Sequence, residues 1–554
     1  MTHRLQMASA VHALLLAGAV MLGTSPDAFA QSASPRPSAP QAATAAPTRA
    51  AALDAMQRAS TFMIEKVAHK GAFVWSYLPD LSRRWGEMEA RETMIWIQPP
   101  GTPTMGHLFL DAYHATGDEF YSRAAEQVAG ALIYAQLPAG GWNYVADYAG
   151  DQSLREWYDT VGKNGWRLEE FQHDWGNATF DDGGTAQSAT LLLRMYLEKR
   201  DPTIKAALDK VIQLVLDSQY PIGAWPQRFP LKDEFRHHGR PDYTSFLTFN
   251  NDVTAGNIEF LVLCYQTLGE ARFLDPIRRG MMSFVVTQMG PPQAGWALQY
   301  TPDLQPAGAR SYEPKALATH TTAACIEQLL SFYRLTGDTR FLARIPEALD
   351  WLETVRLPAD VAAVSGRSHP TFVELGTNKP LYVHRRGSNV VNGEYYMDGD
   401  PKNTIGHYSS FREVNVARMR LELAEVKALA PATLAKDSAI APGAKTVALP
   451  RYFEVRSPRA GFPGGAPPAS PDERAARAIA TLDSQGRWIT ELGSTTHPYR
   501  GDGSTTVTPG DFAGTNVGDD RDTSPYRAQG LLGISTQAYI RNMGDLIRFV
   551  DLRR

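Results

Sequence analysis

An internal repeat of paired helical segments constrains the fold of this 554-residue chain more than any other feature. Four stretches of similar sequence surround Tyr113, Tyr196, Tyr265 and Tyr333, at successive spacings of 83, 69 and 68 residues. Each stretch reads as an apolar helix, a polar turn and a second helix with apolar residues at i, i+3 and i+4. Such helix pairs bury their apolar faces only by stacking on neighbours, so we predict a mostly α-helical solenoid or closed ring.

Three of the four helix pairs end in a turn that contains Gln, Gly and Trp. Trp142, Trp225 and Trp296 follow the repeat tyrosines by 29, 29 and 31 residues. This regular spacing indicates rigid junctions at one end of each pair. We therefore interpret Trp142 and Trp296 as packing residues of those junctions.

Polar residues precede the first helix of three pairs. The loop before the second pair contains Asp181 and Asp182. The loop before the third contains Asn251 and Asp252, at offsets from the repeat tyrosine that agree to within one residue. Arg310 lies before the fourth pair. Equivalent positions of a ring crowd around one mouth, so we predict that these three loops converge.

Carboxylate and amide oxygens in two matching loops suit a hard cation such as Ca²⁺, and any such site is assembled from distant segments because the sequence has no EF-hand loop. Two alternatives remain open. Asp and Asn before a helix also act as N-caps. Paired carboxylates also serve glycosidases, although adjacent residues such as Asp181 and Asp182 rarely flank a glycosidic bond from both sides.

Composition narrows the classes of partner. Lys and Arg number 55 against 59 Asp and Glu, for a formal net charge of −4. The chain therefore has no global positive field that would favour nucleic acid. Its two cysteines, Cys264 and Cys325, are too few for a disulfide framework or a thiolate zinc site. They either pair with each other or remain buried free thiols.

The two ends of the chain differ from its repeated part. Residues 1–30 have a basic start, an apolar run and a terminal Ala-Phe-Ala, which predicts a signal peptide cut before Gln31 and a periplasmic or secreted protein. Residues 31–50 are rich in Ala, Pro and Ser and predict a disordered linker. Residues 51–425 form the helical domain. We predict that residues 426–554 form a C-terminal extension with Pro- and Gly-rich loops, and that its final helix packs back on the helical domain.

Five motifs stand in order within the repeated part of the chain: ATFDDGGTAQ, GAWPQRFP, LTFNNDVTAGN, ALQYTPDLQPAGARSYEP and FVELGTNKPLYV. Together, from about Thr179 to Ser410, they resemble the family 10 polysaccharide lyases, which are pectate lyases with an α/α toroid fold. That family typically reads Ile-Asp-Asn-Gly where this chain has Phe180-Asp181-Asp182-Gly183. It typically reads Asn-Asp-Asp where this chain has Asn250-Asn251-Asp252.

The resemblance implies that residues 51–425 are an α/α toroid catalytic domain with irregular and short β excursions, expected to act as a monomer. The implied reaction is anti β-elimination of α-1,4-polygalacturonate, assisted by Ca²⁺, to give 4,5-unsaturated oligogalacturonides. The implied base is Arg310, although a guanidinium loses its proton only in alkaline solution or in a strongly cationic, water-excluding pocket. The implied calcium ligands are Asp181, Asn251 and Asp252. The residues expected to bind substrate are Asp182, Trp225, Gln227, Arg228, Tyr312, Lys315, Arg385 and Arg386.

Two rival functions remain open at this point. One is a lyase for another polyuronate, such as alginate or glucuronan. The other is a toroid that binds acidic oligosaccharides without cleaving them, which the altered Asp182 and Asn251 would permit. Arg310 argues against the binding protein, because the implied base is retained.

Overall fold

A computed structural model describes residues 46–164, 169–232, 242–386, 394–402, 404, 408–455, 469–493, 495–496, 525–526 and 531–553. The predicted signal peptide lies outside this part of the chain, as does the predicted linker up to residue 45. The first described helix, α2 (Arg49–Phe62), begins where Thr48 accepts a hydrogen bond from the backbone of Ala51 at 3.1 Å. None of the described helices is long and apolar enough to cross a membrane.

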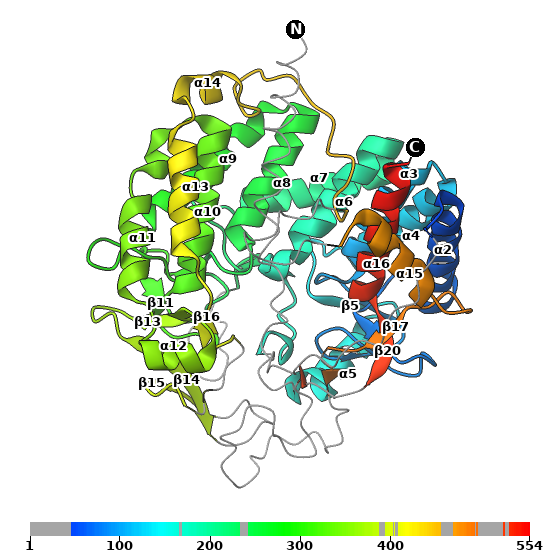
Figure 1. Ribbon diagram of the computed structural model, residues 1–554, viewed down its shortest axis with the longest axis horizontal. Coiled ribbons are helices and arrows are strands. Elements are labelled where there is room, and N and C mark those ends of the chain that lie inside the picture. The colour runs from blue at the N-terminus through cyan, green and yellow to red at the C-terminus, as the bar shows by residue number, and fades with distance from the viewer. Residues whose placement is uncertain are drawn as a thin grey trace.

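The repeats fold into consecutive helix pairs. Their first helices are α3 (Thr102–Thr116), α6 (Gly184–Lys199), α8 (Val253–Leu268) and α10 (Thr319–Thr336). Their second helices are α4 (Glu119–Ala135), α7 (Pro202–Asp217), α9 (Leu274–Val286) and α11 (Ile345–Thr354). Each first helix ends at a residue in the left-handed conformation, namely Gly117, Arg200, Gly269 and Gly337. The pairs stack side by side along an arc (Figure 1), so the predicted α/α architecture of repeated helix pairs is confirmed.

Junctions between pairs are built around the repeated tryptophans. At the end of the second pair the indole N–H of Trp225 donates to the carbonyl of Val215 at 2.8 Å, and its backbone N–H donates to Thr254 at 3.4 Å. Gly223, at φ 106°, lets the turn approach α9 so closely that a Cβ there would lie 2.0 Å from the carbonyl oxygen of Arg279. Trp142 and Trp296 make the same indole contacts, at 2.7 and 3.0 Å, with Leu132 and Phe284.

Trp225 lies within the helical core. It is 0% exposed, and its ring lies close to Gly280 of α9. The predicted role of Trp225 in binding substrate is therefore wrong, because the ring fills the space between helices, as do the rings of Trp142 and Trp296.

Short antiparallel strands lie at one end of the helix pairs (Figure 1), as the predicted β excursions require. The strands that precede first helices are β4 (Met94–Trp96), β5 (Val145–Asp147), β6 (Ala178–Thr179), β7 (Arg228–Phe229), β8 (Leu247–Thr248), β9 (Gln299–Tyr300), β10 (Pro306–Ala307) and β11 (Ala316–Ala318). A four-stranded sheet joins β11 to β13 (Phe372–Glu374), β14 (Pro380–Arg386) and β15 (Glu394–Asp398). The cross-strand pair Thr179↔Arg228 joins β6 to β7, and Thr248↔Gln299 joins β8 to β9.

Remaining elements connect or cover the pairs. The helices are α5 (Asp151–Thr160), α12 (Ala359–Ser365), α13 (Val416–Lys427), α14 (Pro431–Lys436), α15 (Pro471–Thr481) and α16 (Thr536–Asp551). The strands are β1 (Ser76–Tyr77), β2 (Arg84–Trp85), β3 (Glu89–Ala90), β12 (His369–Pro370), β16 (Phe411–Arg412), β17 (Ile489–Glu491), β18 (Thr495–Thr496), β19 (Pro525–Tyr526) and β20 (Leu532–Ser535). Cys264 and Cys325 are buried free thiols.

The C-terminal extension runs back across the helix pairs. Two repeat tyrosines hold it, since Tyr333 donates to the carbonyl of Leu429 at 2.8 Å and Tyr265 to that of Ala441 at 2.7 Å. The carboxylate of Asp111 then accepts backbone N–H bonds from residues 453–455 at 2.7–3.0 Å. Helix α16 finally packs against α2 and α3 (Figure 1). Residues 429–455 of the extension thus cross the helix ends opposite the strands.

Candidate active site

The loops before α6 and α8 have the same backbone shape. Asp182 (φ 51°) and Asn251 (φ 52°) both adopt the left-handed conformation, and so do the residues that follow them, Gly183 (φ 68°) and Asp252 (φ 58°). A non-glycine residue in this conformation is strained, and Asp and Asn tolerate it best. Asp182 is therefore the structural equivalent of Asn251.

N-capping does not explain these carboxylates. Asp252 stands directly before α8, but its side chain makes no capping hydrogen bond. Helix α6 likewise follows Gly183 without a side-chain cap, and Asp181 directs its side chain elsewhere. The capping alternative is therefore wrong for both aspartates.

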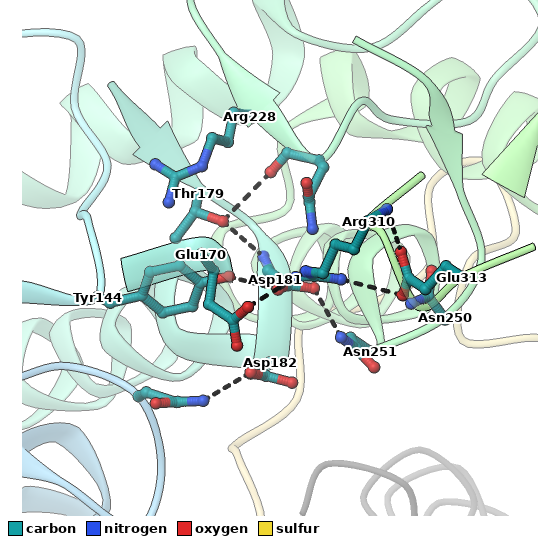
Figure 2. Close-up of polar contacts among 12 residues, drawn as sticks. Tyr144, Glu170, Thr179, Asp181, Asp182, Arg228, Asn250, Asn251, Arg310 and Glu313 are labelled. Carbon is teal, nitrogen blue, oxygen red and sulfur yellow. Dashed lines mark hydrogen bonds and ion pairs between the residues drawn. The ribbon is translucent and has the colours of Figure 1, made fainter. Parts of the chain in front are cut away.

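Arg310, Asp181 and Asn251 meet at the strand end of the fold (Figure 2). Nη2 of Arg310 lies 2.5 Å from Oδ2 of Asp181, and Nδ2 of Asn251 donates to Oδ1 of the same carboxylate at 2.9 Å. The hydroxyl of Tyr144 also donates to Oδ2 of Asp181. The three loops before the second, third and fourth pairs therefore converge, as the repeat predicts.

Two further carboxylates hold the guanidinium of Arg310. Nη1 donates to Oε1 of Glu313 at 3.1 Å, and Nε lies 3.4 Å from Oε2 of Glu170. Glu170 also accepts from the hydroxyl of Tyr312 at 3.1 Å, and its neighbour Glu169 accepts from the backbone N–H of Ser311 at 2.7 Å. The segment around Glu169 and Glu170 thus fixes the loop that carries Arg310.

These contacts set the protonation of the central pair. Burial opposes the charge of Arg310, but Asp181 and Glu313 outweigh it and raise the pKa of the guanidinium well above its usual value. Burial also pushes the pKa of Asp181 upward, yet Arg310 and the hydrogen bonds from Tyr144 and Asn251 hold that pKa below its usual range. As folded, the pair is a guanidinium and a carboxylate.

A second acidic group lies next to this pair. Nε2 of Gln98 donates to Asp182 at 2.6 Å and to Glu87 at 2.9 Å. Burial and the Asp181 charge raise the pKa of Asp182 well above its usual value. Burial and the Glu170 charge raise the pKa of Glu87 to about 8. Glu87 and Asp182 therefore hold their protons more readily than ordinary carboxylic acids do.

The donor set fits a hard divalent cation in its chemistry, because the two loops bring the carboxylates of Asp181 and Asp182 and the amide of Asn251 to one place. Within the described residues, no three His, Cys, Asp or Glu side chains already converge as metal ligands. Burial alone raises the pKa of Asp252 to about 7. The two predicted ligands already in contact are Asp181 and Asn251.

Arg228 lies behind this site. Its Nη1 donates to Asn143 at 3.1 Å and to the carbonyl of Asn177 at 3.2 Å, while its guanidinium carbon lies 5.2 Å from the ring centres of both Tyr144 and Trp175. The side chain is buried, and Nη2 has no hydrogen-bond partner. Arg228 is therefore separated from Asp181 by one tyrosine ring.

Other predicted substrate residues have mixed positions. The carbonyl of Gln227 accepts from the backbone N–H of Phe180 at 2.9 Å, so Gln227 holds the Asp181 loop. Lys315 is exposed. Arg385 and Arg386 lie on β14, and their side chains are outside the described part. Asp182, Asn251 and Tyr408 are partly exposed, whereas Arg310 and Asp181 are 2% and 1% exposed, so the open side of the site is formed by the former three.

Sequence reasoning missed four members of the site: Tyr144, Glu170, Glu313 and Tyr408. Glu313 stands three residues after Arg310, so a proximity search around the base would have found it. Glu170 and Tyr408 lie in segments outside the repeat, where no periodic signal marks them.

Comparison with known proteins identifies the domain. Residues 152–396 match the family model described as Pectic acid lyase. No curated protein matches the chain.

Among solved structures, a mutant of Family 10 polysaccharide lyase from Cellvibrio cellulosa in complex with trigalacturonic acid shares 18% identity over 59% of this chain and 99% of its own, with a TM-score of 0.40. The Family 10 polysaccharide lyase from the same organism shares 17% identity over 58% of this chain and 98% of its own, with a TM-score of 0.39. A family 76 glycoside hydrolase from a bovine Bacteroides thetaiotaomicron strain shares 9% identity over 91% of this chain and 78% of its own, with a TM-score of 0.40. On the family match, this chain carries a pectate lyase family domain at residues 152–396 and is a polysaccharide lyase.

Proposed function

We propose that this chain is an exported pectate lyase that cleaves α-1,4-linked polygalacturonate by anti β-elimination and leaves 4,5-unsaturated oligogalacturonides. The observation that carries this proposal is the contact of Arg310 with Asp181, 2.5 Å apart, inside a pectate lyase family domain. The site places the Arg310 guanidinium among carboxylates and is partly open to solvent at Asp182 and Asn251. A guanidinium there can bind a carboxylate of an acidic substrate.

Calcium is part of the proposal. Asp181 and Asn251 would hold it, with Asp252 of the same loop as the third predicted ligand. Bound there, Ca²⁺ would neutralise the uronate carboxylate, make the C5 proton more acidic and stabilise the charge of the transition state.

Arg310 is the proposed base. It removes the C5 proton in its neutral form, through Nη2, which now contacts Asp181. Since the neighbouring carboxylates raise the pKa of Arg310, the neutral form is rare until Asp181 takes another partner. Glu169 and Glu170 keep the Arg310 loop in place, and Tyr144 keeps Asp181 oriented.

The deciding experiment is the ultraviolet absorbance of the unsaturated product. Polygalacturonate, methylated pectin, alginate and glucuronan are each offered with calcium or with a chelator. We expect product from polygalacturonate with calcium, and none after chelation. Asp181→Ala should abolish it, whereas Asp209→Ala, which removes an exposed partner of Lys205, should not. Turnover that survives chelator and dialysis would contradict the calcium role.

Export is proposed on the leader at residues 1–30, which the described residues do not include. Its basic start, apolar run and Ala-Phe-Ala end are typical of a cleaved signal peptide. N-terminal sequencing of protein from the periplasm or medium should begin near Gln31. An intact Met1 terminus on that protein would contradict it.

A further inference from the structure

The elimination needs a second proton transfer, which the groups named so far leave unassigned. When the C4–O4 bond breaks, the departing O4 carries the electron pair and takes up a proton. A positioned acid typically accelerates such a step by ~10²–10⁴-fold. The donor must lie close to Arg310, carry a proton at working pH and face the open side of the site.

Four tyrosines of the described chain surround Arg310 and its carboxylates. Tyr144, Tyr243 and Tyr312 are 2%, 4% and 1% exposed. The hydroxyls of Tyr144 and Tyr312 donate to Asp181 and Glu170, on the buried side of Arg310. Tyr408 is the one of these four that is partly exposed to solvent.

Tyr408 is connected to Arg310 through one carboxylate. Its hydroxyl donates to Oε1 of Glu313 at 2.8 Å, and the same oxygen accepts from Nη1 of Arg310 at 3.1 Å. Nδ2 of Asn250 donates to the Tyr408 hydroxyl at 3.4 Å. Asn250 immediately precedes Asn251, so the phenol lies beside the proposed calcium loop.

The ring of Tyr408 is held in place on several sides. Ring centres of Tyr312, His320 and Phe372 lie 6.1, 6.1 and 6.4 Å from its own. The guanidinium carbon of Arg412 lies 6.0 Å from the ring. Burial and the Glu313 charge raise the pKa of Tyr408 well above its usual value, so the phenol keeps its proton.

We propose, on the basis of the lyase function above, that Tyr408 is the catalytic acid that protonates the leaving O4. Arg310 takes the C5 proton, the C5–H electron pair becomes the C4=C5 double bond, and O4 leaves with its bonding pair and the Tyr408 proton. The phenolate regains a proton from Glu313, which receives one from Nη1 of Arg310. Arg310 is thereby neutral again, as it was when it accepted the C5 proton, and no proton is exchanged with solvent.

The test compares two leaving groups. Tyr408→Phe is assayed on oligogalacturonate and on an analogue whose C4 oxygen is replaced by fluorine, because fluoride leaves without a proton. We expect kcat on the natural linkage to fall ~10²-fold or more, with KM changed less than about threefold, and the fluoride reaction to stay within a fewfold of wild type. Tyr382→Phe, a buried tyrosine of β14 against Phe411, is the control that should change neither.

Equal losses on both substrates would overturn the assignment, because Tyr408 would then only position Arg310; unchanged kcat on the natural linkage would also overturn it. If the wild-type enzyme cleaved neither substrate, the lyase function and this assignment would both be overturned. If Tyr408→Phe does not fold, difluorotyrosine at position 408 keeps the ring and hydroxyl but is a stronger acid. Its kcat should decline at a lower pH than in wild type, and an unshifted decline would refute the role.

Discussion

Replacing Arg310 by lysine tests the centre of the site. The guanidinium reaches three carboxylates through three nitrogens, at 2.5 Å to Asp181, 3.1 Å to Glu313 and 3.4 Å to Glu170. A lysine ammonium keeps the charge but presents no planar fork, so it retains one of these contacts. Breaking a buried ion pair costs about 3–5 kcal/mol. The released carboxylates can take up protons, which reduces this cost. We therefore expect Arg310→Lys to lower the free energy of unfolding by about 3 kcal/mol.

Turnover should respond much more strongly than stability. If Arg310 removes the C5 proton, kcat should fall by at least ~10²-fold, while oligogalacturonate affinity changes little. Chemical unfolding gives the stability, product absorbance gives kcat, and calorimetry gives the affinity. Arg340→Lys alters an exposed pair with Asp338 and should affect none of the three. Near-wild-type kcat at saturating substrate would refute the base assignment, and a loss confined to affinity would make Arg310 a carboxylate-binding residue.

Two further predictions follow from the shifted pKa values. Burial raises the pKa of Asp252 from 3.8 to about 7, so the folded state binds the extra proton and stability falls as pH rises through this window. In chelator, the free energy of unfolding of Asp252→Asn, relative to wild type, should therefore rise by up to about 4 kcal/mol between pH 4 and pH 8. Urea unfolding measures this difference, and a difference that does not change with pH would contradict the prediction. Because Arg310 is proposed to act in its neutral form, kcat should rise with pH in alkaline solution. Glu170 helps to raise the pKa of Arg310, so in Glu170→Gln this rise should begin at a lower pH, and kcat at pH 8 should be severalfold higher than in wild type. An unshifted pH–rate profile would show that Glu170 does not affect the pKa of Arg310.

Repeat spacing predicted the architecture because each helix pair depends on its neighbours for burial. The same spacing placed Asp181, Asn251 and Arg310 in loops at equivalent ends of successive pairs, and these side chains do meet. Periodicity did not indicate which helices the predicted final helix would contact, and α16 packs beside α2 and α3 although its sequence lies far from the four repeats. Contacts that close an arc join distant segments, and no local pattern records them.

The site was less predictable than the fold wherever its residues lie outside the repeat. Glu170 comes from an excursion between the first and second pairs, and Tyr408 from a segment after the β14–β15 hairpin. Both reach Arg310 through tertiary packing alone. The predicted substrate contact of Trp225 was wrong for a different reason. Its Gly-Ala-Trp sequence fits both a residue that lines a cleft and a residue that packs at a helix junction. Its equivalence to Trp142 and Trp296 was the better guide.

The two loops proposed to bind calcium differ from those of the resembling family by the exchange of one carboxylate for one amide. Where the resembling family reads Asn and Asp, this chain has Asp182 and Asn251, and the two residues occupy equivalent positions, at φ 51° and 52°. The exchange keeps the number of carboxylates constant and moves one from the third repeat to the second. Asn251 donates to Asp181 at 2.9 Å, so a carboxylate at position 251 would repel Asp181 unless a cation lay between them.

Reversing this exchange tests whether the two positions share one cation. Asp182→Asn should weaken calcium binding, because it removes a carboxylate from the site. Asn251→Asp should tighten it but destabilise the metal-free protein, because it adds charge beside Asp181. The double variant restores the carboxylate count, so its calcium affinity should return towards wild type, with a coupling of about 0.5–3 kcal/mol between the two changes. Calcium titration by calorimetry measures all four proteins. Strictly additive effects would show that the loops do not bind a common ion, and that Asp182 serves only its contact with Gln98.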